Sequence, residues 1–394
     1  MDNKFYYLNS SSTDYNDTKQ FNLSDVFYKS NEEARVKIND LSEKIKRLVN
    51  APEDAKVIFN SGATESIATV VHWAAVSFPG FKLCGTNADH SAVLENCKIY
   101  NQKYIKKDDI ENVANDLDRT GAIYLTHVDG KNGEILNVKK VVENINNVEF
   151  LQYGCSPTVY EEDNYNLFNV NSHSLTQYRP LIFLDATQSI LKVPIDMKGW
   201  GLDAVFWSNH KIGGHMGRGC LVIVPRSEHP FVPLIGGAQN GNLRGGSISA
   251  NSILEDSDIY NYKDHLHDRR RQWFAAKKYL EEKGLKVYTP NKPHLFNTLL
   301  IDTGANCPYS VVSSLAEENI YMSPKSACMA ERKINETQAG GAHQYGIWDG
   351  YDVENIKDEQ YDGKPFSNAV RMSFLYGDEL DKNALDKIAE VINN

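Results

Sequence analysis

Short apolar runs that alternate with helical patterns dominate the chain from residue 56 onward. The runs with strand character cover residues 56–59, 82–85, 122–128, 181–184, 204–207 and 220–224. Runs rich in Val, Ile, Leu and Phe without strict alternation are typical of strands buried on both faces. Because strands that alternate with helices form crossover units, the pattern predicts an α/β fold with a mostly parallel sheet covered by helices.

Helical patterns lie before and after this series of strands. Residues 24–50 are predicted to be helical, because Ser30 and Glu33 have the spacing of a capping box and an apolar stripe follows. A second helix is predicted over 378–392, with Asp378 as its N-cap.

The chain length of 394 residues fits two domains. We expect a large domain over 15–254, with an excursion rich in Asn, Tyr and Ser over 149–180. A smaller α+β domain is expected to combine 1–14 with 255–394, with a second excursion over 335–367.

The balance of charge limits the classes of partner. Lys and Arg number 42 against 52 Asp and Glu, a formal net charge of −10. Nucleic acid and anionic membranes require a basic surface, so neither is expected as the main partner. No apolar run approaches the roughly 18 residues of a membrane span, and the N-terminus lacks the basic start and apolar middle of a signal peptide. We therefore expect a cytoplasmic protein.

Six cysteines are scattered without a C-x-x-C pair, at positions 84, 97, 155, 220, 307 and 328. In a chain of this length they indicate free thiols rather than a disulfide scaffold or a zinc site, and no metal is expected. Cys328 lies in a predicted loop beside Lys325, Arg332 and Lys333, and positive neighbours favour a reactive thiolate. The other five lie in or beside apolar or helical patterns and are expected to be packing residues.

Polar residues follow five of the predicted strands at the point where each strand ends. These residues are Asn60 to Glu65, Asp89 and His90, Thr126 and His127, Asp185 and Gln188, and Ser208, His210 and Lys211. In open α/β sheets, ligands bind beyond the carboxyl ends of the strands. The arrangement therefore predicts one shared site.

Three kinds of group at these strand ends suit three parts of one ligand. Residues 61–66 (SGATES) offer backbone N–H groups and hydroxyls to a phosphate at a helix N-terminus, although a simple N-cap explains them about as well. Lys211 can bind an aldehyde, although most lysines are surface charges. Asp185 closes an apolar strand and needs a cationic partner, such as a protonated pyridine nitrogen. Pyridoxal 5′-phosphate (PLP) carries all three groups.

Eight blocks of the sequence share their order and rough spacing with one enzyme family. They are FNSGATES, NADHSAVLENC, YLTHVDG, FLDATQSILKVPID, FWSNHKIGGHMGRGCLVIV, GGAQNGNLRGGSIS, SPKSAC and AVRMSF. Through these blocks, over about residues 5–392, the chain resembles the cysteine desulfurases, which belong to the class V aminotransferase group of fold type I PLP enzymes. The DATQ and S-x-H-K blocks mark the cofactor superfamily, and the SAC block narrows the resemblance to desulfurases.

The resemblance implies how PLP would be held. Lys211 would form an imine with its aldehyde and later shuttle protons, and Asp185 would pair with the pyridinium nitrogen. His90 would stack on the ring and act as an acid or base, and Gln188 would hydrogen-bond the phenolic oxygen. The phosphate would be held by Ala63, Thr64, Ser208, His210 and, from the other subunit of a homodimer, Ser247.

The resemblance also implies the reaction. Arg371 would bind the carboxylate of L-cysteine with its two-pronged guanidinium. Cys328 would attack the substrate sulfur, which leaves L-alanine and a persulfide on the enzyme. The sulfur would then pass to an acceptor protein or thiol, for iron–sulfur cluster biogenesis or tRNA thiolation.

One departure from the family concerns residues 127–130, where the usual run is His-Val-Asn-Asn. Gly130 stands where the family has an Asn that contacts the phenolic oxygen, so either Asn132 replaces it from a shifted loop or the contact is missing. His127 is interpreted as a satisfied core histidine rather than a spacer beneath the cofactor. Two other functions stay open. Another class V reaction, such as selenocysteine lyase or transamination, is favoured if Cys328 is dispensable, and a non-enzymatic scaffold would need none of the retained site residues.

Overall fold

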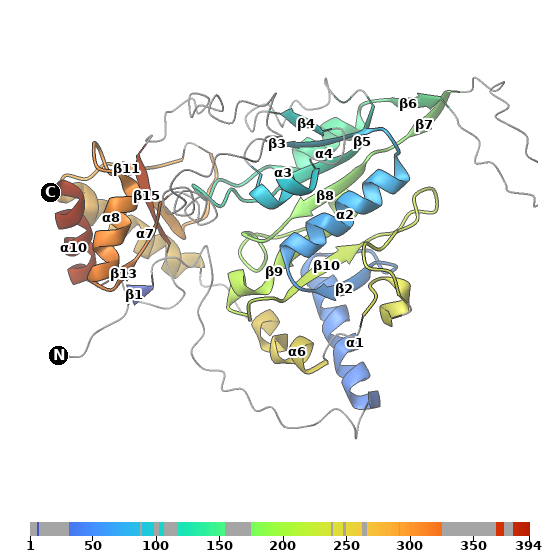
Figure 1. The fold of residues 1–394 in the computed structure, drawn as a ribbon, viewed down its shortest axis with the longest axis horizontal. Helices are drawn as coiled ribbons and strands as arrows, with labels where there is room; N and C mark the ends of the chain where they lie inside the picture. Colours follow the sequence, from blue (N-terminus) through green and yellow to red (C-terminus); the bar gives the residue numbers. More distant parts are fainter. Residues whose placement is uncertain are drawn as a thin grey trace, which may run out of the picture.

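The computed structural model describes residues 6–7, 31–86, 89–97, 102–105, 117, 119–153, 175–237, 239–246, 250–261, 266–290, 292–324, 368–373 and 381–394 (Figure 1). Its centre is a seven-stranded sheet in the order β2-β10-β9-β8-β5-β3-β4. The strands are β2 (Lys56–Asn60), β3 (Lys82–Thr86), β4 (Gln102–Ile105), β5 (Thr120–Thr126), β8 (Leu181–Asp185), β9 (Ala204–Ser208) and β10 (Gly219–Ile223). All six predicted strands are confirmed, and β4 is an addition.

The sheet is mostly parallel, as predicted. The pairs β8–β9, β5–β8, β3–β5 and β3–β4 are parallel, whereas β10 is antiparallel to both of its neighbours. The strands β9, β8, β5 and β3 therefore end at one edge of the sheet, where the predicted site residues follow them.

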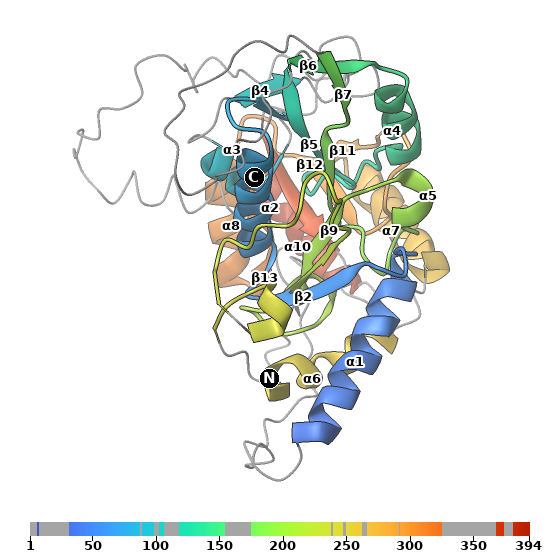
Figure 2. The same ribbon diagram turned by 90° about the vertical axis from the view of Figure 1, so that its right-hand side faces the viewer.

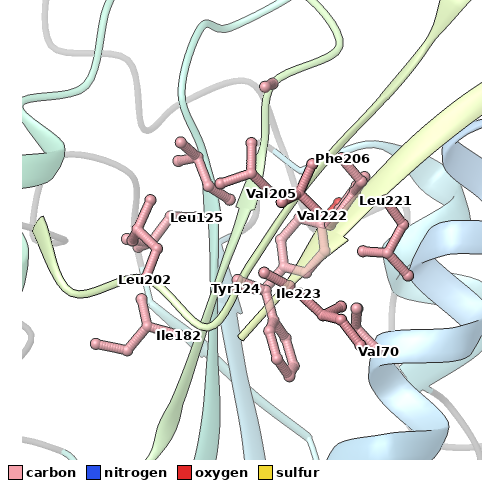
Figure 3. Close-up of a cluster of buried hydrophobic side chains, with 14 of the residues drawn as sticks. Val70, Tyr124, Leu125, Ile182, Leu202, Val205, Phe206, Leu221, Val222 and Ile223 are labelled. Carbon is pink, nitrogen blue, oxygen red and sulfur yellow. The ribbon is translucent and has the colours of Figure 1, made fainter. Parts of the chain in front are cut away.

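Helices cover both faces of this sheet. In Figure 2, α2 (Ala63–Ser77) and α3 (Ser91–Cys97) lie on one side, and α4 (Val138–Asn146) and α5 (Met197–Trp200) lie on the other. The side chains between the layers form one large hydrophobic core. Figure 3 shows part of it, including Val70 of α2, Tyr124 of β5 and Phe206 of β9. Burial on both faces explains the continuous apolar runs of the sequence.

A second hydrophobic core lies in the C-terminal third of the chain. A four-stranded antiparallel sheet has the order β11-β12-β15-β14. Its strands are β11 (Val287–Tyr288), β12 (Thr298–Asp302), β14 (Ser323–Pro324) and β15 (Ala369–Ser373). The helices of this part are α7 (Leu266–Glu282), α8 (Pro308–Glu317) and α10 (Lys382–Asn393). Its core centres on fully buried Trp273, Leu280 and Ile388.

We propose that the two cores mark the two expected domains. The strand β1 (Tyr6–Tyr7) pairs with β13 (Ile320–Tyr321), which supports the assignment of the N-terminus to the smaller domain. The larger core extends past the expected boundary at residue 254 to include Tyr260, in the segment of α6 (Ala250–Glu255) and the 3₁₀-helix η4 (Ser257–Asn261).

Several predicted helix ends are corrected. The first helix, α1 (Asn31–Leu48), ends two residues before the predicted end at residue 50, whereas residues 24–30, with the proposed cap Ser30, lie outside the described residues. The last helix begins at Lys382, and its N-cap is Asp381, whose side chain accepts a hydrogen bond of 2.8 Å from Asn383 N. The predicted cap Asp378 lies outside the part of the chain that is described.

The first excursion is bounded by a pair of strands. β6 (Phe150–Tyr153) and β7 (Leu175–Tyr178) pair antiparallel, so both ends of the 149–180 stretch have regular structure that the sequence did not indicate. The excursion over 335–367 lies outside the described residues. Among the residues that are described, no helix is both long and apolar enough to cross a membrane.

Candidate active site

The N-terminus of α2 meets the end of β9. Ala63 N donates a hydrogen bond of 2.8 Å to Ser208 Oγ, which joins two of the predicted phosphate contacts. Gly62 precedes the helix with φ of 130°, and a Cβ placed on it would lie 3.0 Å from Ser208 Oγ. The site therefore requires glycine here for both its backbone and its space. Thr64 is exposed and His210 is half-buried at the same edge of the sheet.

Glu65 fixes the loop in front of this helix. Its carboxylate accepts hydrogen bonds from Ser61 N (3.0 Å) and Ser61 Oγ (2.7 Å), and it forms an ion pair with Arg244 Nε at 2.7 Å. Burial alone would raise the pKa of Glu65, but the hydrogen bonds from Arg244 and Ser61 hold it below its ordinary value. Arg244 lies three residues before Ser247, which itself lies outside the described residues.

Asp185 closes β8 and is 7% exposed. Its Oδ2 accepts a hydrogen bond of 3.0 Å from Tyr124 Oη, and its Oδ1 accepts one of 2.9 Å from Thr187 N. Within the described part of the chain, no Lys, Arg or His forms an ion pair with this carboxylate. A buried carboxylate is stable only with compensating partners, so the site is suited to a cationic ligand atom.

His90 and Asp89 follow β3. His90 is exposed, and its Nδ1 accepts a hydrogen bond of 3.1 Å from Ala92 N, so the neutral ring carries its proton on Nε2. Asp89 is buried and accepts hydrogen bonds from Thr86 Oγ1 (2.9 Å) and Thr126 Oγ1 (2.7 Å). Burial raises the pKa of Asp89 to about 6 despite these bonds.

Lys211 lies in a short 3₁₀-helix, η2 (Asn209–Ile212), directly after β9. It is half-buried, and its carbonyl oxygen accepts a hydrogen bond of 3.2 Å from Lys192 Nζ. The segment that carries Lys211 is fixed by Asp256, a residue that is 1% exposed. Asp256 Oδ2 accepts a hydrogen bond of 2.9 Å from Asn209 Nδ2, and its Oδ1 lies 2.5 Å from His215 Nδ1. No motif in the sequence indicated this anchor.

Arg371 reaches the same region from the smaller sheet. It lies on β15, is 3% exposed, and donates a hydrogen bond of 2.7 Å from Nη1 to Gly130 O. A Cβ on Gly130 would lie 3.5 Å from Gln188 Nε2, so this loop lies beside the turn after β8. Asn132 is buried, and its Oδ1 accepts a hydrogen bond of 3.0 Å from Glu134 N within its own loop. Its contact with the phenolic oxygen stays a prediction.

The cysteines are described in part. Cys328 and Cys155 lie outside the described residues, together with the three cations near Cys328. Cys84, Cys97 and Cys220 are buried, as expected of packing residues, and burial raises the pKa of Cys97 to about 12. Cys307 is exposed at the start of α8, so the expectation of packing was wrong for this residue.

His127 lies in the core, where its side chain contacts α5. Its ring is 2% exposed and contacts Trp200 edge-on at 5.6 Å between centroids, and burial lowers its pKa to about 4. The interpretation of His127 as a core residue is correct, but the expectation that its ring nitrogens are satisfied by hydrogen bonds was wrong. Nδ1 of His127 has no hydrogen-bond partner among the residues of known placement. No group of three possible metal ligands occurs in that part of the chain.

Comparison with known sequences places this geometry in context. The profile of the aminotransferase class-V family matches residues 10–152 and 169–245, together more than half of the chain. The chain is similar to the cysteine desulfurase IscS of Buchnera aphidicola subsp. Acyrthosiphon pisum (strain 5A), with 26% identity over 250 residues. This match covers 61% of the chain and 55% of that relative. The cysteine desulfurase IscS of Pasteurella multocida (strain Pm70) is 24% identical over 296 residues, 70% of the chain and 65% of the relative. The chain thus matches between about half and two thirds of the length of these relatives.

Solved structures share the fold. A NifS-like protein superposes with a TM-score of 0.70 at 19% identity, over 99% of this chain and 98% of that one. The apo cysteine desulfurase from Thermococcus onnurineus NA1 gives 0.67 at 14% identity, over 98% and 94%. SspA in complex with cysteine gives 0.64 at 18% identity, over 94% and 99%. With a family profile that matches most of the larger core, the protein belongs to the class-V aminotransferases.

Proposed function

We propose that the protein is a PLP-dependent cysteine desulfurase that converts L-cysteine to L-alanine and receives the sulfur on Cys328. The observation that carries the proposal is Asp185, a buried carboxylate whose described partners are all neutral, at the edge of the sheet that also holds Lys211. The names of the similar proteins support the choice of reaction within the family.

The residues at the strand ends fit PLP. Asp185 lacks the cation that a protonated ring nitrogen would supply, and the N–H groups at the start of α2 suit the phosphate. Gly62 has no Cβ to crowd Ser208, whose Oγ accepts a hydrogen bond from the first of these N–H groups, Ala63 N. Lys211 would hold the cofactor covalently, with His90 over the ring and Gln188 at the phenolic oxygen. Bound PLP supplies an electron sink for charge that develops on the substrate α-carbon.

The protein's own residues bind the substrate and move its protons. The buried guanidinium of Arg371 is suited to the carboxylate of L-cysteine, because a charge-assisted pair gains strength away from water. The Nζ of Lys211 would remove the α-proton and return a proton to the product. His90, with its proton on Nε2, would donate or accept a proton at the exposed side of the site.

Sulfur transfer requires no external oxidant. The Cys328 thiolate attacks the substrate sulfur, an S–S bond forms, and the substrate C–S bond breaks. The electron pair of that bond stays on carbon and takes up a proton, which gives L-alanine and a Cys328 persulfide. An acceptor thiol then removes the terminal sulfur. The identity of this acceptor, a homodimer completed by Ser247, and a cytosolic location remain predictions from the sequence.

The proposal is tested on the purified protein. We expect a yellow protein that forms alanine from L-cysteine and gains one sulfur on the peptide that carries Cys328, as measured by mass spectrometry. Cys328→Ala should lose the persulfide, and Lys211→Ala should lose the covalently held cofactor.

Cys307→Ala is the matched control, since Cys307 is an exposed cysteine that lies at the start of α8 and is not among the predicted site residues. It should react as the wild type does. A yellow protein without persulfide would favour another class V reaction, such as selenocysteine lyase or transamination. A protein that cannot take up added PLP would refute both enzyme functions and favour a scaffold.

A further inference from the structure

The strand β5 supplies hydroxyl groups to the carboxylates of both neighbouring strand ends. It lies between β8 and β3 in the sheet. Tyr124 Oη donates a hydrogen bond of 3.0 Å to Asp185 Oδ2, and Thr126 Oγ1 donates one of 2.7 Å to Asp89 Oδ1. The two hydroxyl residues are two positions apart on the strand, so they lie on one face of the sheet.

Tyr124 has an apolar environment except for its hydroxyl group. Its side chain is 4% exposed, and its ring lies 5.8 Å from the ring of Phe206 and lines the same space as Val71 and Phe183. A phenylalanine would fill this space equally well. A phenol in such a place needs a hydrogen-bond partner, and the partner here is Asp185.

The hydroxyl of Tyr124 is a permanent donor. Burial, reinforced by the negative charge of Asp185, raises the pKa of this phenol well above its ordinary value, so it stays protonated at physiological pH. A hydroxyl that cannot ionise keeps its proton for the bond to Asp185. It also fixes Oδ2, while Thr187 N fixes Oδ1.

We propose that Tyr124 is a positioning residue for PLP: its hydroxyl would hold the Asp185 carboxylate in the orientation that receives the ring nitrogen. The inference rests on the proposed pairing of Asp185 with that nitrogen. Without the hydroxyl, Oδ2 of Asp185 loses the hydrogen bond that fixes it, whereas the bond from Thr187 N to Oδ1 remains. A carboxylate fixed at one oxygen can turn, so it would pair less well with a pyridinium.

Asp185 is faced by groups from three elements. From β5 the facing titratable group is Tyr124, and from the turn after β3 it is Asp89. From β9 the residue in register is Phe206. Among these, Tyr124 is the side chain that donates a hydrogen bond to the Asp185 carboxylate, so its loss should weaken the contact with the ring nitrogen.

The test is a titration of apoprotein with PLP at neutral pH, followed by quenching of tryptophan fluorescence. Loss of a hydrogen bond to a charged group corresponds to roughly tenfold weaker binding for Tyr124→Phe. The visible band of the bound cofactor should shift as well. Tyr178→Phe is the matched control, because it removes a buried hydroxyl that donates to Thr120 O, 3.1 Å away, outside the site.

Asp185→Asn separates this inference from the proposed function. We expect Asp185→Asn to bind PLP weakly and Tyr124→Phe to add nothing in that background, since both changes act on one contact. If Asp185→Asn weakens binding but Tyr124→Phe leaves the affinity and the visible band unchanged, the positioning role is wrong and the function stands. If Asp185→Asn binds PLP as the wild type does, the pairing of Asp185 with the cofactor is wrong. Equal effects of Tyr124→Phe and Tyr178→Phe would indicate a general loss of packing and would overturn the inference.

Discussion

Gly130 offers a direct test of how this chain departs from the enzymes it resembles. Those enzymes have an Asn in its place, yet nothing in the structure forbids a side chain there. Its φ lies outside the left-handed region, and the three atoms nearest to a Cβ would belong to the side chain of Gln188, at 3.5 to 3.8 Å, which is ordinary contact. The hydrogen bond from Arg371 Nη1 to Gly130 O involves the backbone and would survive the substitution.

The expected magnitude follows from this geometry. Gly130→Ala restricts the unfolded chain without strain in the folded one, so the free energy of unfolding should rise by about 0.4–1 kcal/mol. Gly130→Asn should be similarly stable and adds an amide beside Gln188. If that amide reaches the phenolic oxygen of PLP, a net hydrogen bond of about 0.5–1.5 kcal/mol corresponds to roughly two- to tenfold tighter binding.

Gly133 in the same loop is the matched control. Its φ is 78°, and a Cβ there would lie 3.1 Å from Leu295 O, a backbone atom that cannot rotate away. Gly133→Ala should therefore lower the free energy of unfolding by about 1 kcal/mol or more. Two glycines three positions apart are thus expected to respond with opposite sign.

The assays are urea unfolding of the apoproteins and PLP titration of each variant. If Gly130→Ala is destabilised as much as Gly133→Ala, the interpretation that residue 130 tolerates a side chain is refuted. If Gly130→Asn binds PLP no more tightly than Gly130→Ala, the position of residue 130 differs from that of the family's Asn.

Three further predictions concern buried polar groups. Because burial lowers the pKa of His127 from 6.5 to about 4, the unfolded chain binds the proton first, and stability should fall by up to about 3 kcal/mol between pH 6.5 and pH 4. His127→Leu should lose this slope in urea unfolding, and an unchanged slope would contradict the assignment. The pKa of Asp89 is raised from 3.8 to about 6 by burial, so the folded state keeps its proton longer and stability should fall by roughly 2–3 kcal/mol as pH rises through this window. Asp89→Asn should gain stability relative to the wild type over the same window, and a constant difference would argue against it. Asp256→Ala removes the acceptor of Asn209 and His215, so it should cost about 3 kcal/mol in urea unfolding. It should also weaken retention of PLP at Lys211, whereas full stability would show that the anchor is dispensable.

The parts of the fold that the sequence predicts are those where burial on two faces leaves a continuous apolar run. The six predicted strands are all central or paired on both sides except β2, whose run is nonetheless apolar. The strand β4 was missed because it is an edge strand that pairs only with β3 and begins with Gln102 and Lys103. Edge strands carry polar residues, which removes the pattern that reveals them.

Helix ends are harder to predict, because capping residues recur. Asp378 and Asp381 both precede the same apolar pattern at a spacing of three, and either could accept a bond from the first turn. The structure selects Asp381, since Asn383 N lies 2.8 Å from its side chain. Only the packing of α10 against α7 and α8, which the sequence does not encode locally, decides where the first turn begins.

Some residues of the candidate site could likewise be predicted from the sequence, and others could not. Residues that follow a strand, such as Asp185, Ser208 and Lys211, were predictable because the topology of an open sheet assigns ligands to the strand ends. Tyr124 was not, because it lies inside an apolar run and reads as a core residue. Its role depends on the register of β5 against β8, which pairs Thr126 with Asp185 and brings the Tyr124 hydroxyl within 3.0 Å of the carboxylate.

This register brings neutral hydroxyl groups, rather than cations, from β5 to the buried carboxylates of the site. Asp89 and Asp185 are both buried, at the ends of the two strands that flank β5, and the hydroxyls of Thr126 and Tyr124 satisfy them without supplying any charge. Burial already raises the pKa of Asp89 to about 6, so one of the two carboxyls can become neutral near physiological pH. Asp185 keeps two neutral donors and no cation in the described chain. A ligand that brings a protonated ring nitrogen to Asp185 would therefore stabilise the folded protein and relieve the repulsion between the two carboxylates at once.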